Sequence, residues 1–153
     1  TGFAGQGTTV YQPQINADGH RFPRFANLSE IWEQGAEYLA LFPNVLLGVH
    51  NDHYFNIILT PDGTGRTNEQ IEIYYADKAA AGEDYAAMRA INTEMWKTVF
   101  SEDIQVVEGM QKGRSAPGYD GGKFSAVMDE STHHFHKWVA EELGGCQRTA
   151  QTS

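Results

Sequence analysis

The spacing of hydrophobic and polar residues changes near residue 80 and divides the chain into two halves. From Glu37 to Ala76, short apolar runs alternate with turn-forming segments, and "EQIEIYY" at 69–75 places apolar residues at every second position. Pro43 bends or interrupts the first run, while "HND" at 50–52 and "PDGTG" at 61–65 have the composition of turns. The short connections predict three strands in an antiparallel meander.

The second half has the periodicity of α-helices. From about Glu83 to Gln111, apolar side chains recur so that eight of them fall within an arc of roughly 120°. Residues 112–122 are rich in glycine and would end this helix. A last helix is predicted from Glu130 to Leu143, with Gly144-Gly145 as its C-terminal cap and a polar tail at 146–153. The eight apolar positions are Tyr85, Met88, Trp96, Val99, Phe100, Val106, Val107 and Met110.

Asp103 interrupts the apolar arc of the long predicted helix. Aspartate is rarely buried without a partner, because an isolated buried carboxylate is strongly destabilising. The other acids of this helix, Glu94, Glu102 and Glu108, project away from the arc. Two interpretations of Asp103 therefore stay open: a carboxylate satisfied by an arginine, a tyrosine or backbone donors, and a metal ligand.

Half of the six histidines of the chain lie in "STHHFHKW" at 131–138. On a helix, His133 points away from the apolar face, and His134 and His136 flank it on opposite sides. A zinc ion needs three or four convergent ligands, so these diverging rings favour ordinary hydrogen-bonded histidines. A surface metal held by His133 and His136 is the alternative. The apolar face consists of Phe135, Trp138, Val139 and Leu143.

Composition restricts the partners that the chain could have. The 153 residues, 41% of them hydrophobic, predict one globular domain. Twenty acidic and 11 scattered basic residues argue against nucleic acid and against a membrane surface. "TGFAGQG" at 1–7 lacks the Lys-Ser/Thr of a phosphate loop and is expected to be loop and edge strand. The single cysteine, Cys146, excludes an internal disulfide or a Cys-ligated cluster and fits a cytoplasmic location.

The order and spacing of several short motifs resemble the end of the catalytic domain in Rieske non-haem iron oxygenase α subunits, the ring-hydroxylating dioxygenases. The likeness is best from Leu41 to Leu143, and "LFPNVLL" and "LTP" at 59–61 also fit it. The motifs are Glu102-Asp103, Glu108, Gln111 to Gly113, Tyr119 to Gly122, and His134-Phe135-His136.

This resemblance implies an α+β helix-grip fold, Bet v 1-like or START-like, with an antiparallel sheet wrapped around a long C-terminal helix and here incomplete. It implies that Asp103 is the carboxylate ligand of a mononuclear Fe(II), whose two histidine ligands come from outside the matched segment. Val99 and Trp96, one and two helical turns away, would line the substrate pocket; ordinary core packing is the alternative for both.

The resemblance also implies a larger enzyme. The family's Rieske domain carries a [2Fe-2S] cluster that one cysteine cannot supply, so residues 1–145 are expected to be the C-terminal portion of the catalytic domain, inactive alone. The whole enzyme would use dioxygen to hydroxylate or demethylate an aromatic or quaternary ammonium substrate. Electrons would come from a ferredoxin or reductase, and the assembly would be a homotrimer or α3β3. Candidates for an aromatic cage are Tyr54, Tyr74, Tyr75 and Trp96.

Two other functions remain open. A non-enzymatic helix-grip domain would hold a small apolar ligand between sheet and helix, with Asp103 as a polar anchor. Alternatively, two of His20, His50 and His53 could complete a metal triad with Asp103, although histidines in turns are usually solvated.

Overall fold

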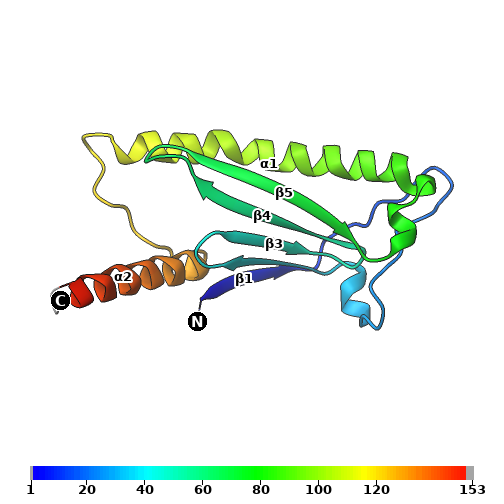
Figure 1. The fold of residues 1–153 in the computed structure, drawn as a ribbon, viewed down its shortest axis with the longest axis horizontal. Coiled ribbons are helices and arrows are strands. Elements are labelled where there is room, and N and C mark those ends of the chain that lie inside the picture. The colour runs from blue at the N-terminus through cyan, green and yellow to red at the C-terminus, as the bar shows by residue number, and fades with distance from the viewer. Residues whose placement is uncertain (1, 151–153) are drawn as a thin grey trace.

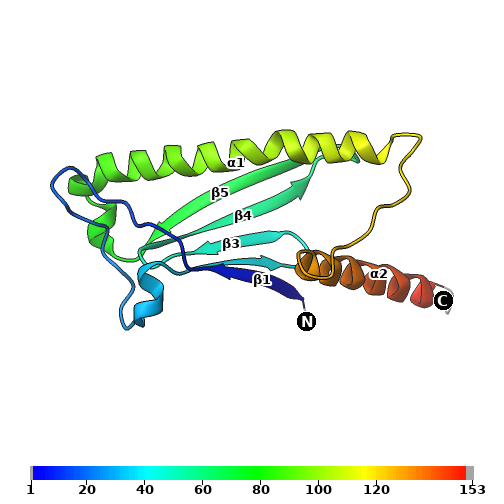
Figure 2. The ribbon, with the colours of Figure 1, turned by 180° about the vertical axis from the view of Figure 1, so that it is seen from behind.

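The computed structural model describes the backbone of residues 2–150 and the side chains of residues 2–145. Five strands form one antiparallel sheet, and two long helices accompany it (Figure 1). Helix α1 runs along the length of the sheet, and α2 lies beside β1 at the other side (Figure 2). The elements are β1 (Phe3–Thr8), η1 (Glu30–Glu33), β2 (Ala36–Leu41), β3 (Val45–Val49), β4 (His53–Pro61), β5 (Thr67–Tyr75), η2 (Lys78–Ala81), η3 (Glu83–Tyr85), α1 (Ala86–Arg114) and α2 (Glu130–Ala150).

The sheet confirms the predicted meander and adds two strands to it. Its order is β1-β2-β3-β4-β5, so every strand pairs with its neighbour in sequence. Pro43 interrupts the first apolar run rather than bending it: β2 ends at Leu41, and β3 begins at Val45 and pairs back on β2. The glycine-rich start of the chain forms β1, an edge strand paired with β2, as its composition indicated.

Only the first part of α1 packs on the sheet. Met88 and Trp96 are buried, whereas every residue from Ser101 to Arg114 is exposed. The apolar arc predicted from the sequence is therefore longer than the part of α1 that the described residues cover. Val106 and Val107, near its end, are about 60% exposed. Within residues 2–150, no helix has the length and apolar character that a bilayer crossing requires.

Helix α2 does not end where the sequence predicted. It continues through Gly144 and Gly145 to Ala150, so the expected cap at residue 144 is wrong. A cap of this kind needs a residue in the left-handed region, and the glycines with positive φ lie elsewhere in the described chain, at positions 19, 63, 121 and 122. Residues 151–153 of the expected polar tail lie outside the described residues.

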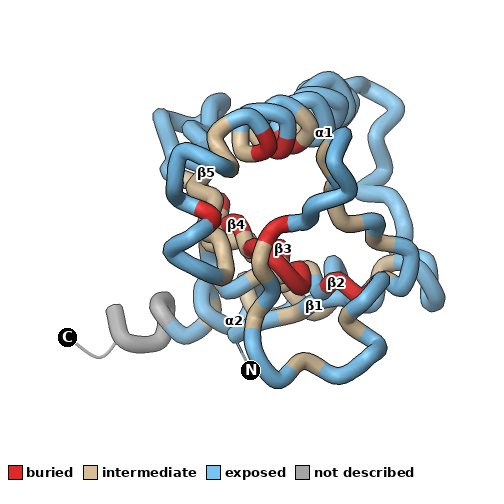
Figure 3. Tube along the Cα trace, turned by 90° about the vertical axis from the view of Figure 1, so that its right-hand side faces the viewer, coloured by how far each residue is buried: buried red, intermediate tan, exposed pale blue. Residues whose placement is uncertain are grey.

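The buried residues gather between the sheet and α1 (Figure 3). One cluster joins Phe22 and Ala80 to Met88, and the other joins Phe55 and Ile57 to Trp96. In the second cluster, Gly48 of β3 lies opposite Phe55 of β4, and the Phe55 ring occupies the space where a Cβ on Gly48 would stand. The missing side chain of Gly48 therefore lets Phe55 lie flat across the inner face, against the ring of Trp96 at 4.7 Å.

Candidate functional site

A cavity of about 640 Å³ lies between the inner face of the sheet, α1 and the start of α2. Its wall is mainly apolar and aromatic, which is typical of sites for small organic molecules. The wall also includes a few residues with polar side chains, among them Tyr38 and Asp103. The ring-bearing residues of the wall are Tyr38, Phe42, Phe55, Trp96, Phe100 and Phe135.

The structure brings together the three site residues that the sequence singled out. Trp96, Val99 and Asp103 all line this cavity from α1. Their spacing of three and four residues places them on one face of the helix. Trp96 is 6% exposed and Val99 is 40% exposed, so the cavity is closed at Trp96 and opens toward the later turns of α1.

The Asp103 carboxylate has no hydrogen bond or ion pair with the residues that the structure describes, and it is exposed. The partner network that the sequence left open, an arginine, a tyrosine or backbone donors, is therefore not formed within residues 2–145. Because Asp103 is exposed, its carboxylate does not need a partner from within the protein. The carboxylate of Asp103 is therefore exposed, unpaired among the described residues, and situated at the open side of an apolar cavity.

Residues 3–145 match the family model described as the catalytic domain of the ring hydroxylating alpha subunit. The chain belongs to this family. Its α+β architecture, a five-stranded antiparallel sheet with one long helix across it, is the fold expected for such a domain. No solved structure matches the chain.

The curated relatives are Rieske-type oxygenases. The putrescine 2-hydroxylase of Ralstonia nicotianae is 30% identical over 138 residues, which cover 86% of this chain and 35% of the relative. The choline monooxygenases of Atriplex hortensis and Spinacia oleracea are 26% and 24% identical over 109 residues, covering 71% of this chain and 24% of each relative. The matched region of this chain thus spans about a quarter to a third of the length of these relatives.

A complete metal site is not present in the part of the chain that the structure describes. No group of three or more His, Cys, Asp or Glu side chains there could hold an ion. The alternative triad of Asp103 with two of His20, His50 and His53 is therefore wrong. Among the described residues that line the cavity, the unpaired carboxylate of Asp103 is of the donor type that iron accepts, and no three possible ligands come together.

The histidines of α2 pack on aromatic rings. His133 and His136 both contact Phe124, at ring-centroid distances of 5.1 Å, and His134 lies 5.6 Å from Phe42. Phe135 and Trp138 also pack on Phe42, as the buried face predicted, but Leu143 at its end is 64% exposed. The pair His133 and His136 gains no third ligand from the described residues.

Only some of the candidates for an aromatic cage line a cavity. Tyr54 and Tyr74 stack on each other at 4.9 Å, and neither lines the 640 Å³ cavity. Strand alternation explains this, because Tyr54 lies between the inner residues His53 and Phe55 and so points to the opposite face. Tyr75 and Trp96 share a second cavity of about 460 Å³ along β5.

Sequence reasoning missed a cluster of buried polar residues at the β3–β4 turn. We expected the turn histidines to be solvated, but His50 and His53 are 0% and 1% exposed. Their rings stack on each other with centroids 4.5 Å apart and planes inclined by 12°. The signal for this burial is alternation: His50 follows the inner position Gly48 by two residues, and His53 precedes the inner Phe55 by two.

The segment before β2 covers this turn. Asn51 donates from Nδ2 to the carbonyl of Trp32 at 2.8 Å, and the Phe25 amide donates to the Asn51 carbonyl at 2.9 Å. The ring of Tyr11 packs on His50 at 4.4 Å, and its hydroxyl donates to Asp52 Oδ1 at 3.3 Å. Residues 11–34, to which the sequence assigned no role, therefore seal the turn from solvent.

Burial changes the proton affinities in this cluster. Desolvation, and secondarily the neighbouring His53, lower the pKa of His50 from 6.5 to about 3. Burial, followed by the charge of Asp52, raises the pKa of Tyr11. Burial also raises the pKa of Tyr38, whose hydroxyl lies 3.4 Å from His50 Nε2. His50 and both tyrosines are therefore neutral at pH 7.

The low pKa of His50 makes the stability of the protein depend on pH. Between pH 6.5 and about 3, the unfolded chain binds a proton at residue 50 that the folded chain does not bind. The free energy of unfolding is therefore expected to fall as the pH drops through this window, by up to about 1.4 kcal/mol per pH unit from this group. Urea unfolding of the full-length protein at pH 7, 6, 5 and 4 measures the slope. The variant His50→Gln removes the titrating group, so an equal slope in that variant contradicts the expectation.

Proposed function

We propose that this chain forms the C-terminal part of the catalytic domain of a Rieske non-haem iron oxygenase α subunit, in which Asp103 is a ligand of a mononuclear iron. The observation that supports this most directly is the unpaired Asp103 carboxylate beside an apolar cavity, within the segment that matches the family. Trp96 and Val99 would then contact the substrate.

Bound iron would supply the activation of dioxygen next to the substrate. Asp103 would be one of the residues that hold the iron, and its carboxylate would neutralise part of the metal charge. The apolar wall of the cavity would limit the access of water to the substrate. The two histidines, the [2Fe-2S] Rieske cluster, a ferredoxin or reductase, and a homotrimer or α3β3 assembly belong to the whole protein that we propose.

We further propose a substrate that is a small organic cation or an aromatic compound, which the whole protein hydroxylates or demethylates. The rings of Tyr38, Trp96 and Phe100 line the cavity, and such rings attract cationic ammonium groups. The names of two relatives, putrescine 2-hydroxylase and choline monooxygenase, both refer to compounds with cationic nitrogen. The chain itself carries a net charge of −9, which favours a cationic ligand.

The rival function is a non-enzymatic domain that binds a small apolar ligand in the same cavity. The two functions differ in metal content and in turnover. The test is iron analysis of the full-length protein, followed by oxygen consumption with a panel of quaternary ammonium, polyamine and aromatic compounds. Iron together with substrate-dependent oxygen consumption supports the oxygenase, and ligand binding without either supports the rival.

Enlarging Val99 is expected to reduce the room for substrate. In the full-length enzyme, Val99→Phe should raise KM about tenfold, because the larger ring fills part of the 640 Å³ cavity. Val106→Phe is the matched control, since Val106 lies on the same helix, is 60% exposed and does not line the cavity. Steady-state kinetics compare the two variants. An equal effect of both substitutions would contradict the assignment of Val99 to the substrate wall.

A further inference from the structure

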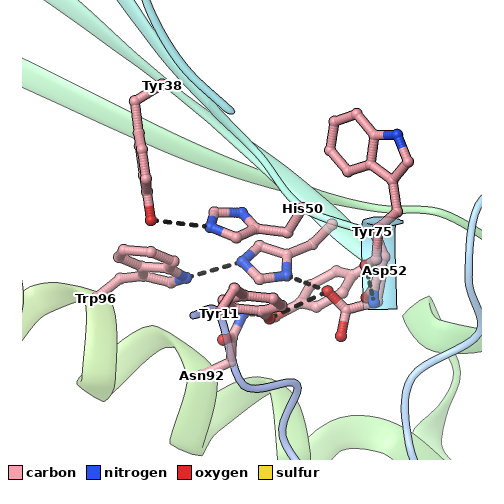
Figure 4. Close-up of polar contacts among 10 residues, drawn as sticks. Tyr11, Tyr38, His50, Asp52, Tyr75, Asn92 and Trp96 are labelled. Carbon is pink, nitrogen blue, oxygen red and sulfur yellow. Dashed lines mark hydrogen bonds and ion pairs between the residues drawn. The ribbon is translucent and has the colours of Figure 1, made fainter. Parts of the chain in front are cut away.

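Trp96 is held from behind the cavity by a chain of buried hydrogen bonds. Its indole Nε1–H donates to His53 Nε2 at 2.9 Å, and His53 Nδ1 lies 2.7 Å from Asp52 Oδ1. The three residues come from α1, from the start of β4 and from the turn before it. Figure 4 labels Trp96 and Asp52, the two ends of this series of hydrogen bonds. All three are nearly fully buried, with 6% exposure for Trp96 and 1% for both His53 and Asp52.

The chemistry of the donors determines which atom donates and which accepts in each of these hydrogen bonds. An indole N–H only donates, so His53 Nε2 must accept and carries no proton. A neutral imidazole has its proton on the other nitrogen, so His53 Nδ1–H donates to the Asp52 carboxylate. Asp52 also accepts from the hydroxyl of Tyr11, at 3.3 Å. The Asp52 carboxylate therefore selects the one tautomer of His53 that can accept a hydrogen bond from the indole N–H of Trp96.

We propose that His53 and Asp52 are positioning residues that fix the indole of Trp96 in the wall of the substrate cavity. This inference rests on the proposed function, because it assigns the 640 Å³ cavity to the substrate. Trp96 lines both cavities of the inner face, so a rotation of its ring would enlarge one cavity and reduce the other. The bond to His53 opposes that rotation, because breaking it leaves a buried N–H without an acceptor.

A second pair repeats the arrangement beside the first. His50 stacks on His53, and its Nε2 lies 3.4 Å from the hydroxyl of Tyr38, another residue of the cavity wall. The turn "HNDH" at 50–53 thus reaches two aromatic side chains of the wall, one through each histidine. The β3–β4 turn thus determines the shape of the cavity near Tyr38 and Trp96, although neither histidine lines the cavity.

Two substitutions of His53 distinguish its hydrogen bond with Trp96 from the space that its side chain fills. His53→Gln places an oxygen acceptor where Nε2 stands and keeps the partner of Trp96. His53→Asn places a donor where Nδ1 stands, so it keeps the contact with Asp52 and loses the one with Trp96. Both variants are made in the full-length protein, together with Trp96→Phe, which identifies the signal of this indole among the three tryptophans of the chain.

The readout that does not depend on activity is the ultraviolet resonance Raman band of the indole that responds to N–H hydrogen bonding. The band is measured in metal-free protein. In His53→Gln, the frequency of the Trp96 band is expected to stay at its wild-type value. In His53→Asn, it is expected to shift to the frequency of an indole N–H without a hydrogen bond. An unmoved band in His53→Asn overturns the inference. Circular dichroism confirms that each variant is folded, and if His53→Asn is not, Asp52→Asn replaces it, because an amide no longer selects the tautomer.

Kinetics then test the consequence for the substrate. His53→Asn is expected to raise KM about fivefold, the size of one neutral hydrogen bond, and His53→Gln less than twofold. In a Trp96→Phe background the two substitutions should have equal effects, because the acceptor has lost its donor. Unequal effects in that background overturn the inference. A protein without iron and without turnover contradicts the proposed function alone, since the Raman result still decides the role of His53.

Discussion

Full-length protein that carries Asp103→Ala is expected to lose its mononuclear iron and its oxygenase activity. In a facial set of three protein ligands, the carboxylate is the only anionic one, so its removal leaves a dication on two neutral imidazoles. The described residues offer no replacement, because no other cluster of possible ligands surrounds the cavity. Metal analysis of the purified protein measures the loss, and oxygen consumption should fall by at least a factor of about 100.

The matched control is Glu102→Ala. Glu102 is the next residue on α1 and is also exposed, but it projects about 100° away from Asp103 around the helix and lines a different hollow, with Glu94 and Lys97. It changes the net charge by the same amount as Asp103→Ala and should leave iron content and turnover near the wild-type values. Full iron occupancy in the Asp103→Ala protein would remove Asp103 from the metal site and with it the basis of the proposed function.

Gly48→Ala is expected to lower the free energy of unfolding by about 2–3 kcal/mol, the usual penalty of overpacking a filled interior. A Cβ at this position would overlap the ring of Phe55, which is 4% exposed and cannot move into solvent. The ring would be displaced toward Trp96 and Phe100, whose centroids lie 4.7 and 5.1 Å away. The substrate wall should therefore change together with the stability, and KM should rise as well.

Gly65→Ala serves as the control for this substitution. Gly65 lies in the turn between β4 and β5, and a Cβ there would meet no atom within 4 Å. Urea unfolding of both variants should show a change within about 0.5 kcal/mol for Gly65→Ala, the range of ordinary surface substitutions. Equal midpoints for the two variants would show that the Phe55 ring can move away at little cost.

The sequence predicted the parts of the fold that depend on local periodicity. The alternation in β4 and β5, the turn at 61–65 and the helical spacing after residue 83 all follow from short-range rules, and the structure has the strands and the helix there. The α+β class, which the family resemblance implied, is confirmed by the antiparallel sheet and the long helix. The end of α2 was wrong because glycine only permits a left-handed cap and does not require one.

The candidate site was predictable in one part and not in another. Helical spacing was enough to place Trp96, Val99 and Asp103 on one face, and they line one cavity. Strand alternation could have placed His50 and His53 on the inner side of the sheet, but it does not show what covers them there. The covering contacts come from Tyr11 and Trp32, which lie far away in sequence. Exposure of Asp103 was likewise a tertiary property, because it depends on where the sheet ends beneath α1.

Phe100 is the last residue of α1 that is even half-buried, and Asp103 lies one turn beyond it. Asp103 therefore lies on a part of α1 that extends beyond the last contact with the sheet. The contact of Trp96 and Phe100 with Phe55 anchors the helix before that point. Seven residues of helix separate Trp96 from Asp103, or about 10.5 Å, so a tilt of about 5° at the anchor moves the carboxylate by about 1 Å. A displacement of that size is enough to alter a catalytic rate about 100-fold. How tightly the aromatic rings pack at the anchor therefore sets how accurately the carboxylate is positioned.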